Sequence, residues 1–116
     1  MKIRVYQINK ERDINRVCFL GYEDLERFQE TTNIDSKIYD MVYESDVECN
    51  SLEDVFQLLN RNHPQGYYAR SLAVSDIIEV ISSDAVIPGF YFCDYIGFKQ
   101  VEFEPNKTQE CFYLHD

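Results

Sequence analysis

Basic residues are scarce in this sequence, and tryptophan and long apolar runs are absent. Eleven lysines and arginines stand against 21 aspartates and glutamates, which gives a formal net charge of −10 at pH 7. A surface this acidic repels nucleic-acid phosphates and attracts basic partners, so direct nucleic-acid binding is not expected. No apolar run approaches the ~18 residues of a membrane span, and charges recur through the N-terminal segment where a signal peptide would be apolar. We therefore expect a cytoplasmic protein that makes no contact with a membrane.

The sequence also lacks the residue clusters that hold metals, phosphates or disulfides. Its four cysteines lie far apart, the nearest two being Cys93 and Cys111, and no Cys-x-x-Cys pair occurs. A zinc site needs clustered ligands, and a disulfide framework needs a secreted context. The four glycines are isolated, so no glycine-rich phosphate loop is present. We expect free thiols that pack as small apolar residues, with no metal and no cofactor.

The chain does carry enough apolar and aromatic material for one folded domain. It has 116 residues, among them nine tyrosines and eight phenylalanines. A chain of this length can bury a core without metals or disulfides, so we expect a single domain over residues 1–116. The densest β-type pattern runs from Tyr67 to Phe103, and we expect this stretch to be the structural spine.

The N-terminal half predicts two strands, a short helix and a third strand. Residues 2–8 alternate and predict a half-buried strand, and the apolar run 17–20 predicts a second strand that forms a hairpin with it. Residues 22–29, with acids in the first turn, predict a short helix. The alternation over 37–47 predicts a strand with an aromatic face toward the core, formed by Tyr39, Met41 and Tyr43.

The C-terminal half predicts one helix and a series of antiparallel strands. Apolar residues at helical spacing follow Ser51, a good N-cap; they are Leu52, Val55, Phe56 and Leu59. Strands are expected at 77–81, 90–95 and 100–104, with an edge strand at 111–114. The sum is an α+β fold, with a single antiparallel sheet of about five or six strands and two short helices packed on one face.

No group of residues marks a catalytic site. Ser71, Ser75 and Asp76 suggest a nucleophile and its partner, but a serine nucleophile needs a base, and His63 is the only histidine in range. We expect Ser75 and Asp76 to cap a turn through their own backbone instead. The protein is therefore expected not to be an enzyme.

Four blocks of the sequence resemble the YodL-like family of small bacterial proteins. They are KIRVYQIN, FLGYEDLERF, the block from SLEDVFQLLN to GYYARSLAVSDIIEV, and GFYFCDYIGFKQVEF, which together cover nearly the whole chain. The most specific parts are residues 71–78 and 92–98, and the chain departs from the usual family pattern at Ala73 and Tyr95, where serine is usual. The resemblance implies a Firmicutes protein carried on mobile elements. It implies no established enzyme activity, so no catalytic residue is carried over.

The acidic surplus gathers in the middle of the chain and suggests a function. Residues 23–54 carry eleven acidic residues against two basic ones. We expect them to form a phosphate-mimicking face that blocks a basic site on a nucleic-acid-handling defence protein, such as a CRISPR effector nuclease or a restriction enzyme. The protein would then be a non-enzymatic inhibitor carried on a bacterial mobile element. The candidate binding residues are Glu23, Asp24, Glu26, Glu30, Asp35, Asp40, Glu44, Asp46 and Glu48.

An exposed aromatic surface is the alternative. Tyrosine is favoured at interfaces because it buries a large area at low entropic cost. Tyr68 and Tyr91 are the candidates, and the protein would then be an interaction module for a housekeeping partner that binds through the Tyr67–Phe103 region. An enzyme of unrecognised type is a third reading, which a deep pocket lined by Asp76, Asp94 and His63 would favour.

Overall fold

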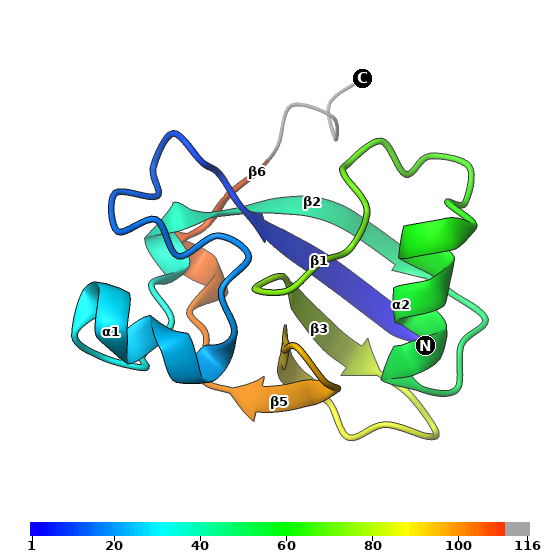
Figure 1. Ribbon diagram of the computed structural model, residues 1–116. Coiled ribbons are helices and arrows are strands. Elements are labelled where there is room, and N and C mark those ends of the chain that lie inside the picture. The colour runs from blue at the N-terminus through cyan, green and yellow to red at the C-terminus, as the bar shows by residue number, and fades with distance from the viewer. Residues whose placement is uncertain (111–116) are drawn as a thin grey trace.

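A computed structural model describes residues 1–110 of the chain as a six-stranded sheet flanked by short helices (Figure 1). The strands are β1 (Lys2–Ile8), β2 (Tyr39–Asp46), β3 (Ile77–Ser82), β4 (Gly89–Cys93), β5 (Phe98–Val101) and β6 (Gln109–Glu110). The helices are α1 (Leu25–Gln29) and α2 (Leu52–Arg61), with 3-10 turns η1 (Tyr22–Asp24), η2 (Ser36–Ile38) and η3 (Pro105–Lys107). The predicted α+β class is confirmed.

The strand order is β5-β4-β3-β1-β2-β6. β1 lies inside the sheet and pairs antiparallel with both β2 and β3, while β3, β4 and β5 follow one another as antiparallel neighbours. β6 pairs with β2 in parallel, so the sheet is mixed rather than purely antiparallel. The antiparallel expectation is thus confirmed for the first five strands, and it is wrong for β6, which runs along the edge of β2 in the same direction.

The two faces of the sheet carry separate apolar clusters. Adjacent residues of a strand point to opposite faces. On one face Val5 and Ile78 pack in a cluster with Val55 of α2. Ile77 packs on the other face in a cluster with Leu25 of α1. The helices therefore cover opposite faces, in contrast to the expectation that both would lie on one, because β3 is apolar on both sides.

A β-bulge lets β2 place two neighbouring residues in the core. Tyr43 pairs with Val5, and Met41 pairs with the next residue of β1, so Val42 is an extra residue in the ladder. Val42 and Tyr43 are both buried against the α2 side of the sheet. Tyr39, at the start of β2, is also buried, but in the cluster on the α1 side, with Met41 packed against it. The predicted core positions of the two tyrosines are confirmed. The prediction that they share one face is wrong, because the bulge turns Tyr43 to the other side.

The predicted strand at 17–20 is wrong, and so is its hairpin with β1. Carboxylate oxygens of Asp13 accept hydrogen bonds from the backbone N–H groups of Val17 (3.0 Å) and Cys18 (2.9 Å), which curls the chain into a loop. Arg16 and Phe19 have φ angles of 56° and 71°, in the left-handed region that an extended strand cannot use. The apolar side chain of Val17 is buried all the same, and this burial explains the misleading pattern.

The helix predicted after Ser51 is confirmed as α2. The Ser51 hydroxyl accepts a hydrogen bond from the N–H of Asp54 at 3.1 Å, and a carboxylate oxygen of Asp54 accepts one from the N–H of Asn50 at 3.1 Å. Both contacts satisfy donors that a helix start leaves unpaired. The predicted helix at 22–29 is also present, as η1 continued by α1.

The strands of the spine follow the prediction with one shift. β3 and β4 match the expected segments closely, but β5 begins at Phe98 and ends at Val101, ahead of the expected 100–104. The cause is the tight turn after β4, where the N–H of Asp94 donates to the carbonyl of Gly97 at 3.1 Å and leaves only two residues in the loop. The expected edge strand at 111–114 lies outside the described residues.

Candidate functional site

Asp76 is the buried centre of a polar cluster between the sheet and the loop that precedes β3. Its carboxylate accepts hydrogen bonds from the N–H of Ala73 (2.8 Å), Nε2 of Gln7 (3.1 Å) and Nη2 of Arg70 (3.3 Å). Burial raises the pKa of this carboxyl to about 7, against the opposing effects of Arg70 and the two neutral donors. The expected turn-capping contact with Ala73 is present, and the cluster joins β1 to the loop.

Ser75 is also completely buried, and its polar groups are occupied. Its hydroxyl accepts a hydrogen bond from the N–H of Phe19 at 2.9 Å, and its carbonyl accepts one from the hydroxyl of Tyr39 at 2.7 Å. The backbone has a φ of 81°, which is uncommon outside glycine. Ser75 thus anchors the distant 13–19 loop rather than its own turn. The predicted turn-capping role therefore holds for the Asp76 carboxylate and not for the Ser75 hydroxyl.

His63 meets Ser71, not Ser75. Its Nε2 lies 3.1 Å from the hydroxyl oxygen of Ser71, and that hydroxyl donates to the carbonyl of Asn60 in the last turn of α2. Within residues 1–110 no carboxylate contacts His63 to orient it as a base. The pair fastens the end of α2 to the following loop.

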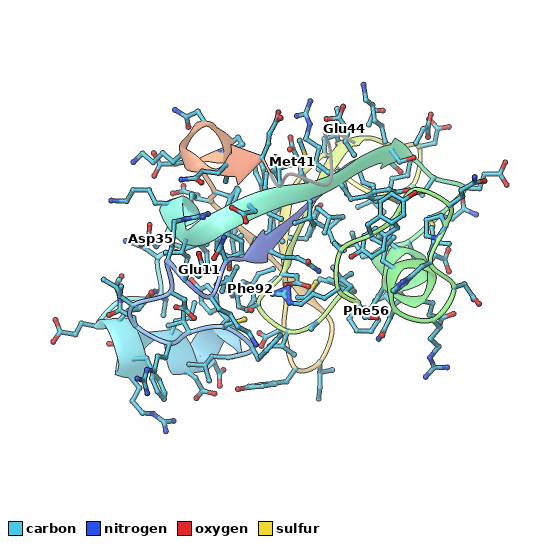
Figure 2. The ribbon with its side chains drawn as sticks, turned by 90° about the horizontal axis from the view of Figure 1, so that it is seen from above. Glu11, Asp35, Met41, Glu44, Phe56 and Phe92 are labelled. Atoms are coloured by element: carbon cyan, nitrogen blue, oxygen red, sulfur yellow. The ribbon has the colours of Figure 1, made fainter. Side chains whose placement is uncertain are left out.

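Basic groups of the N-terminal segment neutralise the predicted acids of β2. Arg4 forms an ion pair with Glu44 directly opposite it on the β1–β2 ladder. Nη2 of Arg12 lies 2.5 Å from Oδ1 of Asp40, and the amino terminus lies 3.3 Å from Oδ1 of Asp46. Figure 2 shows Glu44 on the side of β2 turned away from α2. These three predicted residues are therefore not the centre of an unopposed acidic face.

The unpaired acids of the predicted set gather at η1 and α1. Glu23 and Glu26 are exposed there, and Glu30 ends α1 in an exposed, left-handed conformation. None of these three carboxylates forms an ion pair within the described part of the chain. Asp35 caps η2 near the same end of the molecule, as Figure 2 shows. Glu48 is exposed beyond the far end of β2, so the predicted set is divided between two regions.

The turn between β4 and β5 is fixed beside η1. The hydroxyl of Tyr95 donates to a carboxylate oxygen of Asp24 at 2.7 Å, although its side chain stays largely exposed. A Cβ atom at Gly21 would lie 2.3 Å from the Tyr95 ring, so only glycine permits this approach. Ile96 is 94 % exposed at the tip of the turn. Sequence reasoning missed Ile96, although the short turn between Asp94 and Gly97 was a signal for an exposed tip.

The two tyrosines of the predicted aromatic surface differ in accessibility. Tyr68 is 69 % exposed on the loop after α2. Tyr91 is half-buried within β4, and its hydroxyl donates to the carbonyl of Ile87 at 2.5 Å. Tyr68 therefore offers contact area, whereas Tyr91 already has a structural partner.

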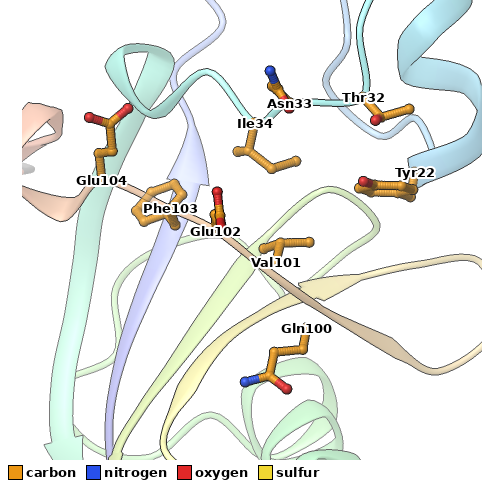
Figure 3. Close-up of a pocket in the computed structure, with 9 residues that line it drawn as sticks. All are labelled: Tyr22, Thr32, Asn33, Ile34, Gln100, Val101, Glu102, Phe103 and Glu104. Atoms are coloured by element: carbon orange, nitrogen blue, oxygen red, sulfur yellow. The ribbon is translucent and has the colours of Figure 1, made fainter.

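A groove of about 490 Å³ runs between the 32–34 segment and the end of β5. Figure 3 shows Ile34 on one wall, Val101 on the other and Tyr22 toward one end. Its other lining residues include Phe103, Glu102 and Glu104. We use the name acidic groove for this groove together with Glu23, Glu26 and Glu30, the exposed acids of the segment that follows its lining residue Tyr22. Its walls come from segments about seventy residues apart, which no local pattern brings together.

The same region of the chain carries a family match. The YodL-like domain family matches residues 2–103. This chain belongs to the YodL-like domain family. The match spans the YodL-like domain from β1 to Phe103, and so includes the Asp76 cluster and most of the acidic groove. No curated protein and no solved structure gave a match.

The sequence-based resemblance is thereby confirmed as family membership. Three further features of this YodL-like domain concern its expected chemistry. Cys18, Cys49 and Cys93 are free thiols, and Cys111 lies outside the described residues. Within residues 1–110 no cluster of three His, Cys, Asp or Glu side chains could hold a metal ion. No helix in this part of the chain is long and apolar enough to cross a bilayer.

Proposed function

We propose that this YodL-like protein is a non-enzymatic binding protein that uses the acidic groove to hold a basic surface of another protein. The observation that carries the proposal is the combination of exposed, unpaired carboxylates with a groove that Ile34 and Val101 line together with polar side chains. Glu23, Glu26 and Glu102 are exposed and form no ion pair among residues 1–110. Such carboxylates attract a basic partner at long range, and Ile34 and Val101 supply apolar area to bury on contact.

Binding rather than catalysis fits the state of the polar side chains. Ser75 and Asp76 are completely buried and both accept hydrogen bonds from other parts of the chain, so neither can reach a substrate. A general base must lie within hydrogen-bond reach of the group that it deprotonates. The histidine that could have served, His63, is bound to Ser71 instead.

The partner that fits best is a protein that itself handles nucleic acid. A phosphate-binding surface is rich in lysine and arginine, and carboxylates of an acidic partner can occupy it in place of phosphates. A CRISPR effector nuclease or a restriction enzyme belongs to this class, and occupation of its nucleic-acid site would inhibit it. Such an inhibitor suits a bacterial mobile element, the setting that the family resemblance suggested.

The arrangement of charges moves the proposed contact away from β2. Asp40, Glu44 and Asp46 already have cationic partners within the chain, so a partner would have to displace those groups. The segment 22–35 carries five carboxylates against a single arginine. The exposed acids at η1 and α1 are therefore the residues to change.

The test compares two charge-reversed variants in capture from a bacterial lysate. One carries Glu23→Lys, Glu26→Lys and Glu30→Lys, and its matched control carries three reversals outside the groove, at Glu48, Glu53 and Asp84. The wild type and the control are expected to capture the same protein at low salt. The groove variant is expected to lose it, and both high salt and a competing DNA duplex are expected to release it.

Two results would contradict the proposal. One is capture by the groove variant at the wild-type level. The other is a partner that stays bound in high salt and in the presence of DNA. If that salt-resistant capture were lost on Tyr68→Ala, the aromatic interaction module would become the better reading.

A further inference from the structure

β5 is an edge strand of the sheet, and the direction of its backbone groups follows from its neighbours. The N–H of Cys93 donates to the carbonyl of Asp76, and the carbonyl of Cys93 accepts from the N–H of Ser75, both at 2.9 Å. The polar backbone groups of Cys93 therefore point toward β3. Because they alternate along a strand, those of Phe92 point the other way, toward its partner Lys99 on β5.

The same alternation turns two residues of β5 outward. Lys99 directs its N–H and carbonyl at β4, so Phe98 and Gln100 direct theirs away from the sheet. No strand of the described chain lies on that side of β5. Figure 1 shows β5 at the lower margin of the sheet, at the end opposite β6. The outer edge thus offers donors and acceptors with the spacing of a β ladder.

The acidic groove lies directly beside this open edge. Val101 lines the groove, and Lys99, two residues earlier on the same face, places its ammonium 4.8 Å from the ring centroid of Tyr22. An exposed edge is commonly guarded by a lysine, but this one is held over an aromatic ring on the face of the sheet. A strand added to β5 would send alternate side chains into the groove and the others to the opposite face.

We propose that an extended, basic segment of the partner adds to β5 as a further strand. Its backbone would pair with Phe98 and Gln100, and every second side chain would enter the acidic groove. There its apolar side chains would lie beside Val101 and its lysines or arginines would meet Glu102 and Glu23. Strand addition takes affinity from main-chain hydrogen bonds and specificity from pockets for alternate side chains, and β5 with the groove provides both. The basic character of the segment rests on the proposed function, whereas its extended pairing rests on the edge alone.

The probe is a library of random linear 12-residue peptides selected for binding to the wild-type protein. Enriched peptides are expected to carry apolar residues and lysine or arginine at every second position, the positions that face the groove. Gln100→Pro removes the outward N–H without touching the β4 ladder and is expected to weaken the best peptide by at least about tenfold, the loss of one or two hydrogen bonds. Gln100→Ala keeps that N–H and is the matched control, with binding expected near the wild-type level.

A second measurement leaves the protein unchanged, in case the proline variant folds poorly. Two versions of the best peptide are N-methylated at alternate residues, one at odd and one at even positions. Because a strand pairs through every second residue, one version is expected to lose binding and the other to keep it. Tolerance of both versions, or of Gln100→Pro, would overturn strand addition.

The remaining outcomes separate this inference from the proposed function. A library that yields no binder overturns strand addition, as does a dimer of the protein that Gln100→Pro dissolves, since a second copy would then be the occupant. A partner lost with the Glu23, Glu26 and Glu30 reversals but retained by Gln100→Pro would leave the proposed function in place and remove strand addition. Neutral peptides that bind in the alternating register would support strand addition and would contradict the basic partner of the proposed function.

Discussion

A single buried carboxyl group connects three segments of this chain. Asp76 receives hydrogen bonds from Gln7 on β1, from Arg70 on the loop and from the N–H of Ala73 in its own turn. Burial disfavours the charged form, and the donors favour it. Burial has the larger effect, since the pKa of Asp76 rises to about 7. Asp76 therefore changes its charge near neutral pH, and the free energy of unfolding should depend on pH in this range.

The sign of that response is set by the raised pKa. An unfolded aspartate has a pKa near 4, so between about pH 4 and pH 7 the folded protein holds the extra proton. The contribution of Asp76 to stability is complete below the unfolded pKa and is lost as the pH rises toward 7. We expect the free energy of unfolding to fall by roughly 1–4 kcal/mol from pH 5 to pH 8 relative to Asp76→Asn, which cannot titrate. Urea unfolding of both proteins at the two pH values measures this difference.

The comparison of slopes makes this prediction independent of the cost of the substitution. Asparagine will destabilise the cluster at every pH, because its amide nitrogen opposes donors that the carboxylate accepted. All other carboxyl groups are common to both proteins and cancel. Parallel pH dependence in the two proteins would show that Asp76 does not titrate on unfolding.

At the scale of the element, the sequence predicts what local contacts determine. α2 is predicted well because its cap, its apolar spacing and its end all lie within a few residues of one another. The strand at 17–20 fails because Asp13 redirects the backbone and Phe19 is tied to Ser75, a contact across more than fifty residues. Local alternation gave Tyr39 and Tyr43 their core positions but could not show that the β2 bulge would bury Val42 as well.

The same distinction explains what could be foreseen of the candidate site. The acidic composition of residues 23–54 is visible in the sequence, and the exposure of Glu23 and Glu26 follows from it. The neutralisation of Glu44 depends on strand register, which places Arg4 opposite it. The acidic groove depends on packing between the 32–34 segment and β5, so it needed the tertiary structure.

The cap of α2 provides a test at this scale. Ser51→Ala removes the acceptor for the N–H of Asp54 and is expected to lower the free energy of unfolding by about 1 kcal/mol. Ser51→Asn keeps an acceptor of similar reach and is expected to stay near the wild-type value. Urea unfolding measures both variants. Equal losses in the two would indicate that the hydroxyl contributes through packing rather than through capping.

At the scale of the whole molecule, the acidic surplus is unevenly distributed. The ion pairs of Arg4 and Arg12 consume part of the negative charge along β2, while η1, α1 and the end of β5 retain exposed carboxylates. The sum over the chain is still −10. Mutual repulsion among these charges favours the expanded, unfolded chain, and the exposed ion pairs offset only a little of it.

Salt should therefore stabilise this protein. The molecule extends 38 × 31 × 26 Å, so at ~10 mM salt, where the Debye length is about 30 Å, most of its charges interact with one another. At ~150 mM that length falls to about 8 Å, and the repulsion across the molecule is screened. We expect sodium chloride over this range to raise the stability by about 1 kcal/mol, equivalent to roughly 5 °C in Tm for a domain of this size.

A thermal melt followed by circular dichroism at the two salt concentrations gives the answer. The variant with lysine at positions 23, 26 and 30 has less charge to screen, so its Tm should rise less than that of the wild type. Salt also weakens the Arg4–Glu44 and Arg12–Asp40 ion pairs, and this effect lowers the Tm. A fall in Tm with salt would therefore mean that these pairs stabilise the fold more than the acidic surplus destabilises it. In that case the carboxylates of the acidic groove would repel one another only weakly, and a basic partner would gain little by neutralising them.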